Sequence, residues 1–134
     1  MEEPVSVLLV EHRSEDARIL GDLLASSGAG FFAVEWVNCL LQALSAAEGR
    51  KEHQIILLDI DLPDGGGVRR FIKPPNGGGQ EAIRQLRTRA GSVPIITLAS
   101  DDGDAAGTQS IANGAQDHLV KWHFGIIHLT KHSR

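Results

Sequence analysis

Short apolar runs alternate along the chain with segments in which apolar residues recur every three or four positions. The run from Val5 to Val10, VSVLLV, is rich in valine and leucine, which is typical of a strand buried on both faces. The next segment begins at Ser14, a residue that caps helices well, and it places Leu20 and Leu24 on one helical face. The pattern predicts a strand followed by a helix.

The later segments predict the same alternation, with short apolar strands and helices that carry one apolar face. Strands are expected over residues 31–37, 55–58, 94–99 and 118–120, and helices after Asn38, over 80–90, over 104–113 and, as a short C-terminal helix, after Lys121. This alternation favours right-handed crossovers and a parallel sheet covered on both faces. We therefore predict an α/β fold, a doubly wound sheet of five parallel strands in a single domain over residues 1–134.

Residues 65–79 interrupt the pattern, because two triple-glycine runs surround the segment VRRFIKPPN and a regular helix cannot form there. We interpret these residues as an exposed, glycine-rich loop inserted before the third helix. Its Arg69, Arg70 and Lys73 form a small basic patch. That patch is either solvated surface or a docking site for a partner.

Composition and charge narrow the range of functions. A chain that is 42% hydrophobic and 22% charged is not disordered by composition, and a formal net charge of -4 gives no general electrostatic case for nucleic acid. The single cysteine, Cys39, excludes an internal disulfide and suits a reducing compartment. The first residues do not resemble a signal peptide, and no apolar run approaches the length of a membrane span. We expect a cytoplasmic protein with neither nucleic-acid nor membrane partners.

Candidate chemistry gathers where the predicted strands end, because ligands of open parallel sheets bind at the carboxyl edge. Glu11 and His12 follow the first strand, Asp59 follows the third, and Lys121 follows the fifth. Clustered carboxylates repel one another, and a cation such as Mg²⁺ or the lysine ammonium relieves that repulsion. A carboxylate held there can attack a phosphoryl group while metal and lysine stabilise the transferring oxygens.

Four segments resemble the receiver domains of response regulators, the CheY-like superfamily. They are LLVEHRSEDARIL, IILLDIDLPDGGG, VPIITLAS and ANGAQDHLVK. The resemblance as a whole extends over nearly the entire chain except residues 66–79 and the last dozen. The resemblance implies the flavodoxin-like receiver fold and a role in two-component signal transduction, with Mg²⁺ as cofactor. It implies that a histidine kinase or phosphotransfer protein passes a phosphoryl group to an aspartate. No enzymatic activity is implied beyond self-phosphorylation and autodephosphorylation of that aspartate.

The resemblance assigns roles residue by residue. Asp59 falls on the phosphoacceptor and Lys121 on the lysine that stabilises the phosphate. The metal would be held by Glu11, Asp59 and the backbone carbonyl of Asp61, and His12 stands where a second acidic ligand is usual. A downstream protein would bind the face made by the fourth helix, the fifth strand and the fifth helix, and a homodimer is a further expectation.

Three positions depart from the family pattern. The imidazole of His12 is a poor ligand for Mg²⁺, which prefers oxygen, so His12 either replaces the cation when protonated or has no ligand role. If a metal still binds, the side chains of Glu11 and Asp61 would have to add oxygens. Ala99 stands at the switch hydroxyl and His118 at the switch aromatic. These departures leave open a phosphorylation-independent pseudo-receiver that acts as a protein–protein interaction module.

We considered two other kinds of site, a phosphohydrolase nucleophile motif and a histidine metal site, and the sequence favours neither. The Asp59-Ile60-Asp61 pair resembles the nucleophile motif of haloacid-dehalogenase-type phosphohydrolases, but that motif usually lies on the first strand and here it follows the third. His123, His128 and His132 have no cysteine or acidic partner nearby in the sequence, so we do not interpret them as a metal site.

Overall fold

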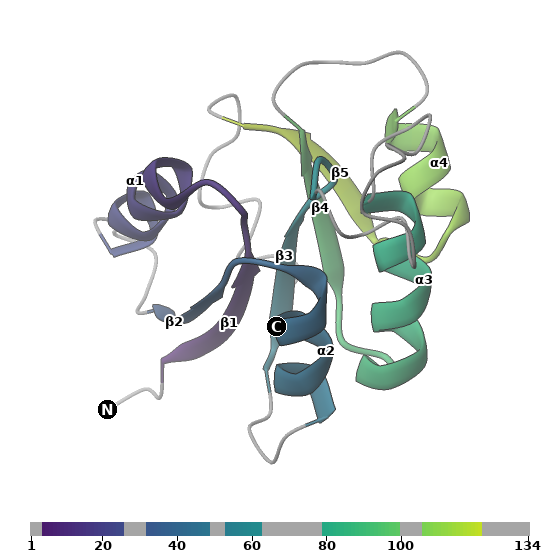
Figure 1. The fold of residues 1–134 in the computed structure, drawn as a ribbon, viewed down its shortest axis with the longest axis horizontal. Coiled ribbons are helices and arrows are strands. Elements are labelled where there is room, and N and C mark those ends of the chain that lie inside the picture. Colours follow the sequence, from purple (N-terminus) through teal and green to yellow (C-terminus); the bar gives the residue numbers. More distant parts are fainter. Residues whose placement is uncertain (1–3, 26–31, 49–52, 63–78, 100–105, 122–134) are drawn as a thin grey trace.

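A computed structural model describes residues 4–25, 32–48, 53–62, 79–99 and 106–121, in which strands and helices alternate (Figure 1). The elements are β1 (Val5–Val10), α1 (Ser14–Ala25), β2 (Phe32–Val37), α2 (Leu40–Glu48), β3 (Ile55–Asp59), α3 (Gly79–Ala90), β4 (Ile95–Ala99), α4 (Ala106–Ala112) and β5 (Asp117–Val120). The predicted alternation is confirmed over this part of the chain. The short helix expected after Lys121 lies outside the described residues.

The strands form one sheet in the order β2-β1-β3-β4-β5, and every pair is parallel. This confirms the predicted five-stranded doubly wound sheet. The chain runs from β1 outward to β2 and then returns to β3 on the other side of β1. Ligands of open α/β sheets bind at the carboxyl edge where the strand order reverses in this way, so the edge above β1 and β3 is the place to look for a site.

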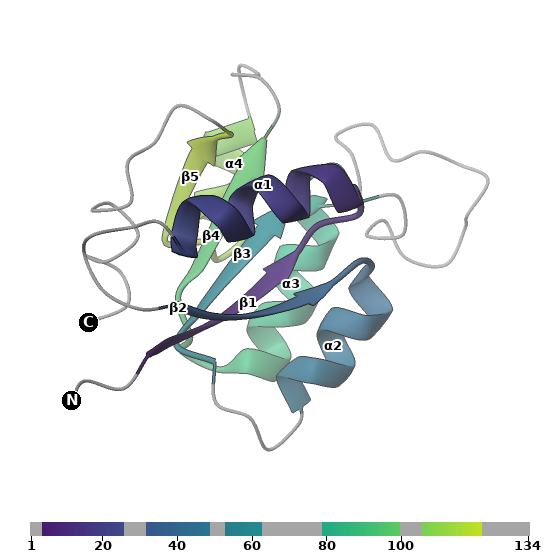
Figure 2. The same ribbon diagram turned by 90° about the vertical axis from the view of Figure 1, so that its left-hand side faces the viewer.

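Helices cover both faces of the sheet, with α1 on one face and α2 and α3 on the other (Figure 2). Successive strand residues point to opposite faces, so one strand serves both cores. Leu57 of β3 packs in the cluster beneath α1, whereas Leu58 packs in the cluster beneath α2 and α3. All five residues of β3 are buried, which places the central strand, and Asp59 at its end, inside the molecule.

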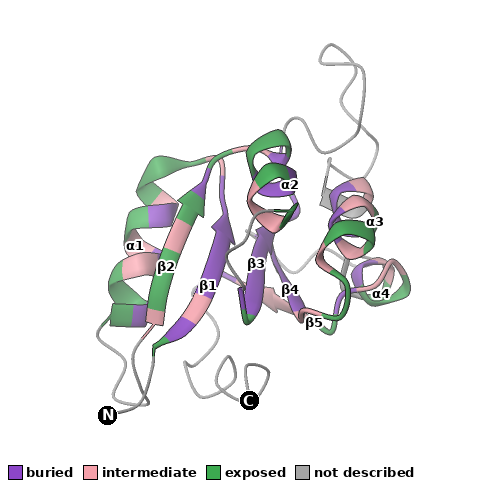
Figure 3. Ribbon diagram, turned by 90° about the horizontal axis from the view of Figure 1, so that it is seen from below, coloured by how far each residue is buried: buried purple, intermediate pink, exposed green. Residues whose placement is uncertain are grey.

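The edge strand β2 is more exposed than β1 and β3 (Figure 3). Val34 and Trp36 are both exposed on it. On α2 the pair Leu40 and Leu44 is buried, whereas the neighbouring Leu41 is 74% exposed. One step along a helix turns a side chain by about 100°, so Leu41 faces away from the core that its neighbours fill.

The ends of the elements differ little from the prediction. Helix α3 begins at Gly79, so this residue belongs to the helix rather than to the inserted loop. Strand β4 begins at Ile95, and the carbonyl of Pro94 before it accepts a hydrogen bond from Ile56 N at 2.9 Å. Gly114, which follows α4 closely, has a φ of 119°, a conformation that favours glycine.

Several predictions fall on parts of the chain that the structure does not describe. The rest of the inserted loop, with its basic patch, falls within residues 63–78, and the C-terminal histidines fall within 122–134. Among the described helices, none has both the length and the apolar character needed to cross a membrane.

Candidate functional site

The sheet brings the predicted site residues together at its carboxyl edge. Asp59 is the last residue of β3, and Glu11 and Lys121 directly follow β1 and β5. The backbones of Glu11 and Lys121 continue the hydrogen bonding of the sheet beyond the ends of β1 and β5. Glu11 N donates to Val37 O at 3.1 Å, and Lys121 N donates to Ala99 O at 2.8 Å. These hydrogen bonds fix the starting points of the side chains that form the site.

Lys121 is the centre of a buried charge cluster. Its Nζ lies 2.6 Å from Glu11 Oε2, 3.1 Å from Asp16 Oδ2 and 3.7 Å from Asp59 Oδ2. Glu11 and Asp59 are fully buried, and Lys121 is only 2% exposed. Because water is excluded, these charges act on one another far more strongly than they would at the surface.

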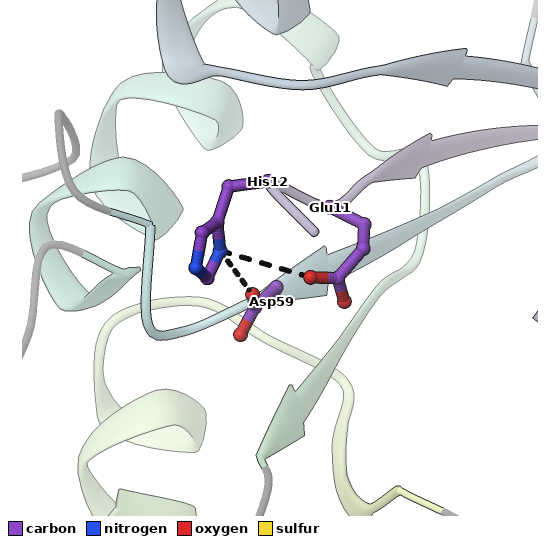
Figure 4. A group of neighbouring side chains, drawn as sticks. All are labelled: Glu11, His12 and Asp59. Carbon is purple, nitrogen blue, oxygen red and sulfur yellow. Dashed lines mark hydrogen bonds and ion pairs between the residues drawn. The ribbon is translucent and has the colours of Figure 1, made fainter. Parts of the chain in front are cut away.

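His12 contacts the predicted acceptor directly (Figure 4). Its Nδ1 lies 2.9 Å from Asp59 Oδ2 and 3.7 Å from Glu11 Oε1. A carboxylate can only accept hydrogen bonds, so Nδ1 carries the proton when it bonds to an ionised Asp59. His12 is therefore part of the site and not a bystander at the start of the helix.

The second oxygen of Asp59 is held by the main chain. Asp61 N donates to Asp59 Oδ1 at 2.9 Å, so both carboxylate oxygens of Asp59 have fixed partners. The Asp61 side chain itself is exposed, and its carboxylate does not join the other potential metal ligands among the described residues. The predicted role of the Asp61 carbonyl as a metal ligand stays a prediction.

Burial and neighbouring charges change the acid strength of the cluster. Burial raises the pKa of Glu11 from 4.5 to about 7, and the nearby Asp59 carboxylate adds to this rise while Lys121 opposes it. For Lys121, burial alone would lower the pKa, but Glu11, Asp59 and Asp16 outweigh burial and raise it above 10.5. Lys121 therefore stays positively charged at neutral pH. Ionised Glu11, by contrast, is destabilised by its burial and by the nearby Asp59 carboxylate.

The two residues that the resemblance assigns to switch positions lie on β4 and β5. Ala99 ends β4, is 3% exposed and brings no hydroxyl to the edge of the sheet, while the neighbouring Ser100 lies outside the described residues. His118 lies on β5, and its Nδ1 is 2.6 Å from the hydroxyl of the buried Thr97. Because Thr97 and His118 pair in register across parallel strands, their side chains point to the same face.

Sequence reasoning missed three contributors. Asp16 was assigned no role in the site, although it lies in the first turn of α1 and its carboxylate is 3.1 Å from Lys121 Nζ. Trp36 anchors the site from the edge strand, because its indole Nε1 donates to Glu11 O at 2.8 Å. Thr97 gave no signal in the sequence, since its pairing with His118 depends on the register of β4 and β5.

Glu11, His12 and Asp59 form a potential metal site, because one ligand atom from each lies within 4.8 Å of the others. The buried Glu11 Oε2 forms an ion pair with the Lys121 ammonium at 2.6 Å. Three carboxylates face one lysine, so the cluster suits an additional cation. The donor set of two carboxylates and one imidazole fits a divalent ion, though it fits Mg²⁺ less well than three oxygens would.

The fold is that of a receiver domain. The family model for the response regulator receiver domain matches residues 7–132, so the chain belongs to this family. The chain is also 33% identical over 121 residues to the KDP operon transcriptional regulatory protein KdpE of Escherichia coli, a match that covers 90% of this chain and 46% of KdpE. It spans less than half the length of the curated relatives it matches.

Solved structures support the same fold. The receiver domain of a sensor histidine kinase from Pseudomonas aeruginosa PAO1, with a magnesium ion coordinated in its active-site cleft, is 26% identical with a TM-score of 0.71, covering 98% of this chain and 95% of that one. A putative response regulator from Chloroflexus aurantiacus is 18% identical with a TM-score of 0.77, covering 98% of both chains. The predicted flavodoxin-like receiver fold and its place in two-component systems are thus confirmed.

Proposed function

We propose that this receiver domain accepts a phosphoryl group on Asp59 from a histidine kinase or phosphotransfer protein. The observation that carries the proposal is a buried carboxylate at the carboxyl edge with Lys121 Nζ 3.7 Å from its Oδ2. Family membership supports the same role. Enzymatic activity beyond reactions of Asp59 itself is not part of the proposal.

In this reaction one oxygen of Asp59 attacks the phosphorus of a phosphohistidine. The new oxygen–phosphorus bond forms while the nitrogen–phosphorus bond breaks, and the donor histidine leaves with the electron pair of that bond. Lys121 supplies positive charge toward the phosphoryl oxygens, and its raised pKa keeps that charge in place. The amide of Asp61 holds Asp59 Oδ1 and so fixes the orientation of the carboxylate.

Glu11, Asp16 and Asp59 share the task of positioning Lys121. The lysine side chain has many rotamers, and three carboxylates at the end of its stem restrict it to one of them. A divalent cation held by Glu11, Asp59 and the Asp61 carbonyl would supply further positive charge to the phosphoryl oxygens. The solved relative from Pseudomonas aeruginosa holds magnesium in its active-site cleft, which supports a cation in this region.

Two features of the chain make its response differ from that of the usual family pattern. His12 forms a hydrogen bond with Asp59 Oδ2. This hydrogen bond draws electron density from the nucleophile and must break before Oδ2 can react. Ala99 cannot hydrogen-bond a phosphoryl group, so the response cannot use a hydroxyl at that position. We expect a slower reaction, with the downstream protein binding at the predicted face of α4, β5 and the fifth helix, the last of which lies outside the described residues.

A titration with beryllofluoride, which mimics an aspartyl phosphate, tests the proposal. We expect amide chemical shifts to change at residues 11–12, 59–61 and 121 in the presence of a divalent ion, Mg²⁺ or Mn²⁺ in separate samples. Asp59→Asn should abolish the change, whereas Asp61→Asn, which alters only an exposed carboxylate, should retain it. No response of the unmodified protein with either ion would contradict the proposal and favour the pseudo-receiver.

A further inference from the structure

We propose that His12 makes this site select a first-row transition ion such as Mn²⁺ over Mg²⁺. The inference concerns the same edge of the sheet as the proposed function and rests on that function only for the location of the ion. It concerns which ion is held and by which atoms, and it does not require that Asp59 be phosphorylated.

The positions of the donor atoms suit one shared ion. Donor atoms that share an ion at about 2.1 Å lie about 3.0 Å apart when adjacent and about 4.2 Å apart when opposite. His12 Nδ1 lies 2.9 Å from Asp59 Oδ2, close to the adjacent spacing, and 3.7 Å from Glu11 Oε1, between the adjacent and the opposite spacing. An ion would take the place of the hydrogen bond between Nδ1 and Oδ2, so little movement of the side chains is needed.

The side chains are already held in place for this task. The second oxygen of Glu11 is engaged by Lys121, and Glu11 Oε1 accepts a hydrogen bond from Arg13 N at 3.2 Å. Asp59 Oδ1 is engaged by the amide of Asp61, which leaves Oδ2 toward His12. Each acid therefore turns one oxygen toward the imidazole, and the three donors converge without a change of backbone.

The chemistry of the donors then decides the ion. Mg²⁺ strongly prefers oxygen ligands, whereas imidazole nitrogen suits ions of the first transition series. Replacing one of three ligands by a nitrogen therefore weakens Mg²⁺ binding while it retains binding of Mn²⁺ or Zn²⁺. The excess of buried carboxylates over the single lysine provides the electrostatic attraction that any of these ions needs.

Paramagnetic Mn²⁺ gives a direct readout on the metal-free protein. We expect Mn²⁺ to broaden the amide signals of residues 10–13 and 59–61 selectively, and an excess of Mg²⁺ should not reverse the broadening. Isothermal titration calorimetry with Mn²⁺ and with Mg²⁺ then gives the ratio of the two affinities. A variant with His123, His128 and His132 changed to glutamine should give the same ratio, because those residues are not the ligands.

His12→Asp is the decisive variant, since it replaces the nitrogen donor by an oxygen donor at the same position. We expect it to bind Mg²⁺ more tightly and to lower the preference for Mn²⁺ by about tenfold or more, the usual size of a ligand effect. His12→Asn, which removes the imidazole without adding a charge, should weaken Mn²⁺ binding. His12 is partly exposed, so both variants are expected to fold, and circular dichroism checks that they do.

The outcomes separate this inference from the proposed function. Equal preference for Mn²⁺ in the unmodified protein and in His12→Asp would overturn the inference, as would Mn²⁺ broadening that falls away from residues 10–13 and 59–61. If the preference follows His12 but beryllofluoride never binds, the metal inference stands and the phosphoacceptor proposal fails. If beryllofluoride binds equally well with Mg²⁺ before and after His12→Asp, and the affinity ratio is also unchanged, the inference fails alone.

Discussion

The two ends of the sheet use charged side chains in opposite ways. At the amino end, Arg87 donates hydrogen bonds to the carbonyls of Gly91, Val93 and Gly114 and to the Gln116 side chain, at 2.7 to 3.2 Å. One cation there meets neutral acceptors. At the carboxyl end, Lys121 meets three carboxylates that repel one another.

The charged side chains at the amino end stabilise the fold, whereas those at the carboxyl end form the candidate site. The Arg87 contacts tie the end of α3 to the turns before β4 and β5, and each of them favours the folded state. At the carboxyl end, burial holds Glu11 and Asp59 together although their charges oppose each other. Such an arrangement lowers stability and creates a nucleophile and a cation side by side, which is common at functional sites.

Replacing Lys121 should have the largest effect on stability. Lys121→Met leaves the fully buried Glu11 and Asp59 without their central cation, so we expect a loss of about 3 to 5 kcal/mol in the free energy of unfolding. Urea denaturation at neutral pH measures this loss. Arg18→Met is the control, because Arg18 is an exposed partner of Asp22 and should change stability by less than about 0.5 kcal/mol. Equal effects would show that the cluster is not a coupled unit.

Stability should also depend on pH through Glu11. Its folded-state pKa of about 7 exceeds the ordinary value of 4.5, so the folded state binds this proton more tightly than the unfolded state. The resulting stabilisation is complete below 4.5 and is lost as the pH rises through about 7. The change is on the order of 2 to 3 kcal/mol.

The pH effect is measured in metal-free buffer by urea denaturation of the unmodified protein and of Glu11→Gln, which mimics the protonated side chain. The difference in unfolding free energy between the two should change across this window. A difference that stays constant with pH would show that Glu11 does not titrate there.

Arg87→Ala should have the next largest effect, a loss of about 2 kcal/mol, because the partly buried carbonyls of Val93 and Gly114 lose the hydrogen bonds that Arg87 donates. Arg84→Ala on the same helix is the matched control. Arg84 bonds to the Glu81 and Asn113 side chains at exposed positions, so its loss should stay below about 0.5 kcal/mol. Thermal and urea denaturation of both variants decide the point, and similar losses would refute the special role of Arg87.

Asp59→Asn should have the smallest effect and the opposite sign. The change removes one of two fully buried carboxylates and keeps an oxygen for the amide of Asp61, so we expect a gain of about 1 kcal/mol. Removing the proposed nucleophile would then stabilise the carboxyl end, whereas removing Arg87 destabilises the amino end. A clear destabilisation by Asp59→Asn would contradict this contrast.

The fold, and most of the residues that meet at the candidate site, could be predicted from the sequence. Apolar runs end at Glu11, Asp59 and Lys121, and parallel strands bring their carboxyl ends to one edge, so the meeting of these residues could be predicted. The predicted strands and helices of the described part agree with the structure to within a few residues. The flavodoxin-like order was implied by the family resemblance and is observed.

The geometry inside the site could not be predicted in the same way. The direction and rotamer of the His12 side chain depend on packing. The sequence therefore left open whether His12 is a cation, a weak metal ligand or a residue with no role in the site. The contact between Asp16 and Lys121 joins residues 105 positions apart, and the bond between Thr97 and His118 depends on the register of β4 and β5. Such contacts are properties of the folded molecule and leave no periodic signal.

The most direct test of the central claim is covalent phosphorylation of Asp59 itself. The protein is incubated with acetyl phosphate and a divalent ion, Mg²⁺ and Mn²⁺ separately, and peptide mass spectrometry locates any added phosphoryl group. We predict one phosphoryl group on Asp59, absent from Asp59→Asn and strongly reduced in Lys121→Met. No modification with either ion, or modification at another residue that persists in Asp59→Asn, would contradict the claim that this edge of the sheet is a phosphoacceptor site.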